Sequence, residues 1–66
     1  MKLINPHGEE VYYNVVVKHD RYRYVVAAAN EATVILGRDR QRRKSRTFAQ
    51  ESQALAYLDR HGYTPA

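Results

Sequence analysis

Alternating apolar and polar positions predict extended structure in the first half of the chain. Residues 11–19, VYYNVVVKH, are rich in valine and tyrosine, which suit a half-buried pleated surface. Residues 22–29, YRYVVAAA, alternate in a similar way, and residues 32–37, ATVILG, form a third apolar segment. Short polar breaks at 19–21 and 30–31 separate them, so the simplest topology is an antiparallel meander of three strands.

The hydrophobic period becomes helical after residue 50. Four side chains recur at helical spacing and would form one face: Ala54, Leu55, Leu58 and His61. Gly62 occupies the place of a left-handed C-cap, and Pro65 prevents continuation. We therefore expect an amphipathic helix over residues 50–61.

Together these elements predict a single α+β domain of the order β-β-β-α. A chain of 66 residues is long enough for one small domain. Residues 1–10 would form a lead-in segment, residues 11–48 a three-stranded antiparallel sheet, residues 50–61 a helix on one sheet face, and residues 62–66 a tail. A fourth strand at 44–48 remains an alternative.

The strand alternation also assigns side chains to two sheet faces. The following residues would face the helix: Val11, Tyr13, Val15, Val17, Tyr22, Tyr24, Val26, Val34 and Leu36. One helix covers only one face, so the other stays open and would carry Tyr12, Asn14, Val16, Lys18, Arg21, Arg23, Val25 and Ile35. Arginine and asparagine reach base edges in a DNA major groove, and a β-ribbon can enter that groove. An ordinary solvated face is the alternative.

The positive charge of the chain is concentrated in one segment. The net charge is +4, yet residues 38–46 alone carry +5, so the remainder sums to −1. Six basic side chains lie there against a single acid, Asp39: Arg38, Arg40, Arg42, Arg43, Lys44 and Arg46. Five of them are arginines, whose planar fork matches phosphate oxygens, and hydroxyls such as those of Ser45 and Thr47 also contact phosphates. The segment predicts a polyanion or acidic protein partner, with a solvated loop as the alternative.

Residues 44–62, KSRTFAQESQALAYLDRHG, resemble a known family. The segment is similar to the strand-then-helix end of the AP2-like, arm-type DNA-binding domains of phage and transposon tyrosine integrases. The matching positions are the aromatic residue after the strand and the Ala-x-Ala-aromatic-Leu pattern of the helix: Phe48, Ala54, Ala56, Tyr57 and Leu58. The resemblance implies a three-stranded sheet whose face inserts into a DNA major groove while the helix packs behind it.

The chain also departs from that family. Gln50 replaces the usual Ser or Thr helix cap, and Lys18 is the only basic residue of the first strand. The catalytic domain of an integrase is absent from these 66 residues, so the resemblance implies no recombinase activity.

No pattern in the sequence indicates an enzyme. The chain contains no cysteine, and its histidines, His7, His19 and His61, lack the spacing of a local metal site. The three glycines stand alone, without a phosphate-binding loop. We expect no catalysis, cofactor or metal. With no apolar run of membrane-spanning length and no signal peptide, a cytoplasmic protein without membrane contact is expected.

The sequence thus predicts a small nucleic-acid-binding module with an accessory or regulatory role. Double-stranded DNA is favoured over RNA or single strands, because most strand tyrosines fall on the expected core side. The expected contacts are Asn14, Lys18, Arg21, Arg23, Arg38, Arg40, Arg42, Arg43, Lys44 and Arg46. The alternative is a protein encoded by a mobile element that inhibits a larger partner through its basic surface, as anti-CRISPR or host-takeover proteins do. A homodimer through an exposed strand edge also remains open.

Overall fold

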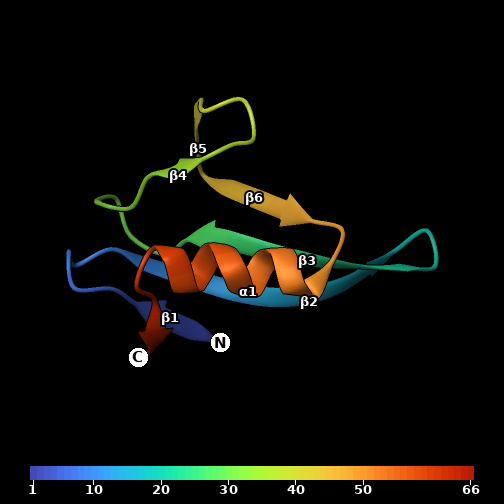
Figure 1. Ribbon diagram of the computed structural model, residues 1–66, viewed down its shortest axis with the longest axis horizontal. Helices are drawn as coiled ribbons and strands as arrows, with labels where there is room; N and C mark the ends of the chain where they lie inside the picture. The colour runs from blue at the N-terminus through green and yellow to red at the C-terminus, as the bar shows by residue number, and fades with distance from the viewer.

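A five-stranded antiparallel sheet with one helix across it forms the body of the computed structural model, which describes residues 1–66 (Figure 1). The sheet has the order β6-β3-β2-β1-β7. Its strands are β1 (Lys2–Ile4), β2 (Glu10–Lys18), β3 (Arg21–Ala28), β6 (Ser45–Phe48) and β7 (Thr64–Pro65). The helix α1 spans Glu51–Arg60, and β4 (Ile35–Leu36) pairs with β5 (Arg42–Arg43) in a separate two-stranded sheet. The α+β class and the antiparallel sheet with its C-terminal helix are confirmed.

Both chain ends contribute strands, which makes the sheet wider than expected. The lead-in segment contains β1, which pairs with β2 through Leu3 opposite Val11. The tail contains β7, which pairs with β1 through Thr64 opposite Ile4. The two termini therefore close one edge of the sheet, and Figure 1 shows them side by side.

The third strand of the main sheet is not the one that the apolar pattern indicates. Residues 32–37 were expected next to β3, but only Ile35–Leu36 are extended, and they pair with β5. The neighbour of β3 is β6, with Tyr24 opposite Phe48. Thr33 explains the departure, because its Oγ1 accepts the Glu10 amide at 2.7 Å and donates to Asn30 Oδ1 at 2.5 Å. These bonds turn the chain away from β3.

The core lies between the sheet and α1 and also receives β4. Its buried apolar members are Leu3, Val11, Val26, Ile35, Phe48, Ala54, Tyr57, Leu58 and Tyr63. Ile35 is fully buried, while Val34 and Leu36 are 41% and 44% exposed, which reverses the expected phase of this segment. The reversal is possible because β4 lies outside the main sheet, so the alternation of β2 and β3 does not set its faces.

Each end of the helix lies within one residue of the predicted range 50–61, but its buried face is rotated. Tyr57 is buried and Leu55 is 49% exposed, the reverse of the expectation for Leu55. At about 100° per residue, Ala54, Tyr57 and Leu58 form one stripe and Leu55 falls outside it. At the C-terminus the Tyr63 amide donates to the Leu58 carbonyl at 3.0 Å, and Gly62 has a φ of +74°. This Schellman geometry confirms the glycine C-cap.

The β2–β3 hairpin projects beyond the rest of the sheet as a two-stranded ribbon, defined here as residues 14–23. β1 pairs with β2 only over 10–12, and β6 pairs with β3 only over 24–27. Figure 1 shows the hairpin extending past the end of α1. Consequently three side chains expected in the core are 50–67% exposed: Val15, Val17 and Tyr22.

The tip of the ribbon holds two non-glycine residues in a left-handed conformation. His19 and Asp20 have φ of 52° and 62°, as in a two-residue hairpin turn of type I′. Replacing Asp20→Gly is expected to stabilise the protein by about 1 kcal/mol, because glycine adopts positive φ without a Cβ clash. Urea denaturation followed by far-UV circular dichroism measures the change. Asp20→Ala serves as the control and should give no gain, so equal stabilisation by both substitutions would contradict the turn assignment.

Candidate nucleic-acid interface

The sheet face opposite the helix carries the basic and amide side chains predicted for it. Side chains alternate between faces along a strand, so the register places Asn14, Val25 and Thr47 in one row across β2, β3 and β6. Along the ribbon, Val16 lies opposite Arg23 and Lys18 lies opposite Arg21. The structure therefore brings four predicted contacts onto one face, which we call the open face: Asn14, Lys18, Arg21 and Arg23.

The positive charges of the ribbon are not neutralised by ion pairs within the chain. Lys2 pairs with Glu10 at 2.6 Å on the same sheet face but at the β1 end, and Arg43 pairs with Asp39 at 2.8 Å in the β4–β5 hairpin. Lys18 and Arg21 are exposed and directly opposite each other, an arrangement of like charges that destabilises a strand pair. Arg23 is half-buried and donates to the Tyr22 carbonyl at 3.3 Å. An anion bound at the ribbon would relieve the repulsion between these side chains.

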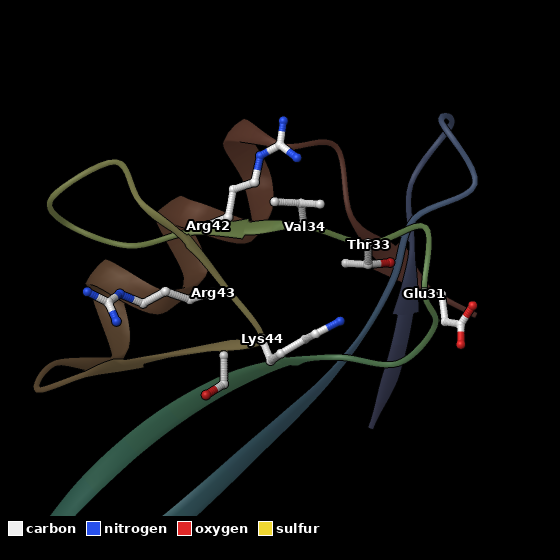
Figure 2. Close-up of a pocket in the computed structure, with 7 residues that line it drawn as sticks. Glu31, Thr33, Val34, Arg42, Arg43 and Lys44 are labelled. Atoms are coloured by element: carbon white, nitrogen blue, oxygen red, sulfur yellow. The ribbon is translucent and has the colours of Figure 1, made fainter.

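The basic segment 38–46 is divided between several surfaces by the β4–β5 hairpin. Arg42, Arg43 and Lys44 line a groove of about 580 Å³, together with Ser45 and the loop at Thr33. Figure 2 shows Arg42 and Arg43 pointing to different sides, as neighbours on a strand do, with Glu31 on the loop at the far side of the groove. Because Ser45 also belongs to the open face by register, this groove adjoins that face at β6.

One of these arginines is partly neutralised inside the hairpin. Asp39 accepts the Gln41 amide at 3.1 Å and the Arg43 guanidinium at 2.8 Å. The backbone amide, and after it the Arg43 contact, lowers the pKa of Asp39 below its ordinary value. Gly37 makes room for the pair, since a Cβ at that position would lie 2.6 Å from Arg43 Nε. Arg40, at a φ of 64°, occupies the turn and lines neither groove described here.

Arg46 lies on the helix side of the sheet, away from the open face. Its guanidinium carbon is 4.8 Å from the centroid of the Phe48 ring and 5.7 Å from that of Tyr57. Its Nη1 donates to the Leu36 carbonyl at 3.4 Å. Arg46 therefore belongs to a second groove, of about 640 Å³, between the β4–β5 hairpin, β6 and α1.

The second groove contains a basic residue that sequence reasoning missed. Arg60, in the last turn of α1, lines it together with Arg38, Arg43 and Arg46. Its helical position three residues after Tyr57 was the available signal, because residues at i and i+3 share a helix face.

Neither a metal-binding cluster nor a membrane-spanning helix is present in the structure. No three side chains of the His, Cys, Asp and Glu types lie together in a way that would hold a metal ion. The helix is too short and too polar to cross a bilayer.

The fold and its surfaces define a small α+β domain with a helix on one sheet face and basic side chains on the other. No protein-family model, no curated protein and no solved structure matches this chain.

Proposed function

We propose that the protein is a nucleic-acid-binding module that binds double-stranded DNA through the open face, in an accessory or regulatory role. The observation that carries this proposal is the ribbon, which projects free of other strands and carries Lys18, Arg21 and Arg23 without a carboxylate partner. A DNA major groove about 12 Å wide admits a two-stranded β-ribbon. The same use of a sheet face is what the resemblance of residues 44–62 implies.

The arrangement supports separate sets of residues for base contacts and for phosphate contacts. Asn14 and Arg23 lie along the ribbon behind its tip and are the candidates for base edges, since both types make bidentate hydrogen bonds with bases. Lys18 and Arg21 flank the turn and would contact phosphates. The groove lined by Arg42 and Lys44 adjoins the open face and would hold the backbone farther along the duplex.

Binding to a fluorescent DNA duplex, measured by anisotropy at 50–200 mM salt, tests the proposal. If four side chains neutralise phosphates, the logarithm of the association constant falls against the logarithm of salt with a slope of about −3.6. Removing one phosphate contact with Arg21→Gln should weaken binding and reduce that slope by about 1.

Arg60→Gln is the matched control, because it removes the same charge from the helix side of the sheet. It should leave the affinity for the duplex and its salt dependence near those of the unaltered protein. Equal weakening by Arg21→Gln and Arg60→Gln, or no binding at the lowest salt, contradicts binding through the open face.

A second candidate function is favoured by the other side of the ribbon. Val15, Val17 and Tyr22 share that side and are each at least half exposed, which is unusual for a surface that contacts only DNA. A protein that inhibits a larger acidic partner would use this apolar side together with the neighbouring basic residues. Pull-down from a lysate treated with nuclease distinguishes the two, since retention of a protein partner favours this second function.

A further inference from the structure

The second groove, on the helix side, brings four arginines together from four parts of the chain. Arg38 comes from the turn of the β4–β5 hairpin, Arg43 from β5, Arg46 from β6 and Arg60 from α1. None of the twelve residues that line the groove is acidic. Asp39 neutralises Arg43 alone, so the remaining three guanidinium groups have no carboxylate within ion-pair distance.

Arg46 is held in place within this groove before any ligand arrives. Its guanidinium lies over the Phe48 ring, and its Nη1 donates to the Leu36 carbonyl. Burial raises the pKa of Tyr57, the other ring beside it, so that side chain stays neutral. A half-buried guanidinium without a counter-ion retains most of its five N–H donors unpaired by protein groups, which favours a bound anion.

Arg38 and Arg60 extend the positively charged surface of the groove beyond Arg46. Both are exposed, and neither makes a side-chain hydrogen bond or ion pair within the chain. Arg60 in the last helical turn is also favourable for the helix dipole, which accounts for its charge but not for the convergence with three other arginines. A volume of about 640 Å³ is ample for two linked phosphate groups.

We propose that the second groove binds a ligand with two adjacent phosphate groups, clamped by Arg46 and Arg60 with Arg38 at the rim. Arginine forks match phosphate oxygens in pairs, and two negative groups would offset the charges that the chain leaves unpaired. The adjacent phosphates can belong to a free polyphosphate or nucleotide, or to the backbone of a nucleic-acid strand. The groove lies at the β6 edge of the sheet, and none of Asn14, Lys18, Arg21 and Arg23 lines it, so it does not depend on duplex binding at the ribbon.

Inorganic pyrophosphate is the probe, followed in ¹H–¹⁵N spectra that include the arginine Nε–H signals. Saturable shifts are expected for the Nε–H groups of Arg46 and Arg60 and for the amide of Gly37, with little change at Asn14. Arg60→Gln should weaken pyrophosphate binding roughly tenfold, the loss expected for one charge-assisted contact. Because Arg60 is exposed, the variant should fold, and its dispersed spectrum verifies that.

Arg40→Gln is the matched control, since it removes the same charge from the hairpin that supplies Arg38 and Arg43, at a position outside the groove. Equal weakening by Arg40→Gln and Arg60→Gln, shifts at all basic residues without saturation, or equal affinity for inorganic phosphate would each overturn the proposal. Competition experiments then distinguish the two possible ligands of the groove. Displacement of pyrophosphate by ADP identifies a free polyphosphate or nucleotide as the ligand. Displacement by a single-stranded oligonucleotide alone identifies the backbone of a nucleic-acid strand. Excess pyrophosphate should not release a DNA duplex from the open face. The proposal for the second groove and the proposal for duplex binding can therefore be contradicted independently of each other.

Discussion

Ile35→Ala is expected to destabilise the protein by about 2–5 kcal/mol, the usual cost of truncating a fully buried isoleucine to alanine. Ile35 has no exposed surface and connects β4 to the core beneath the helix. A domain of 66 residues has a total stability of roughly 3–10 kcal/mol, so the substitution removes much of it. Urea denaturation followed by circular dichroism gives the loss directly.

Leu36→Ala is the control, because the neighbouring side chain is 44% exposed. It should cost less than about 1 kcal/mol, as surface substitutions generally do. The opposite ranking, with Leu36→Ala the more damaging, would show that the phase of β4 is that of the alternating pattern and not that of the structure. The milder Ile35→Val should keep the protein folded. It should still loosen the β4–β5 hairpin, and because that hairpin supplies Arg38 and Arg43, pyrophosphate binding in the second groove should weaken.

The apolar pattern could not show which side chains of residues 34–36 face the core, and the reason is physical. Val34, Ile35 and Leu36 are all apolar, so the sequence contains no polar position to mark the outer face. The hydrogen bonds of Thr33 with Glu10 and Asn30 set the direction of the chain before β4. The bond to Glu10 joins residues 23 positions apart, and no local pattern reveals it.

The exposed ribbon, in contrast, follows from element lengths that the sequence did predict. A ten-residue helix is about 15 Å long, while the nine residues of β2 span about 30 Å. The helix can therefore cover only about half of the hairpin. Alternation correctly separated Asn14, Lys18 and Arg23 from the helix side, but it could not show that Val15 and Val17 extend beyond the helix.

Basic residues that are close in the sequence do not all lie on one surface of the structure. Residues 38–46 were expected to act as one clamp, yet the hairpin sends Arg42 and Lys44 to one groove and Arg38 and Arg46 to another. A tight turn between two short strands reverses the chain within a few residues, which separates neighbouring side chains. The same folding brings in Arg60 from the helix, fourteen residues beyond Arg46.

Asn5→Ala is expected to cost about 2–4 kcal/mol, because one buried amide joins two parts of the chain through four hydrogen bonds of about 0.5–1.5 kcal/mol each. Asn5 is 6% exposed, and its Oδ1 accepts the backbone amides of His7 and Glu9 at 3.1 Å and 3.0 Å. Its Nδ2 donates to Glu9 Oε1 at 3.0 Å and to the His61 carbonyl at 3.3 Å. Alanine fills the position but leaves the amides of His7 and Glu9 and the helix-end carbonyl without this partner.

The bond to His61 gives this substitution a local consequence that a general loss of packing does not have. It connects the turn after β1 to the C-terminus of α1, so hydrogen exchange should rise first at the amides of Gly62 and Tyr63, which close the helix. Asn14→Ala, the same change on the open face, should alter stability by less than about 0.5 kcal/mol while weakening duplex binding. A uniform rise in exchange across the sheet, with the helix end no more affected than β3, would contradict the role of Asn5 as a connection between the turn after β1 and the helix end.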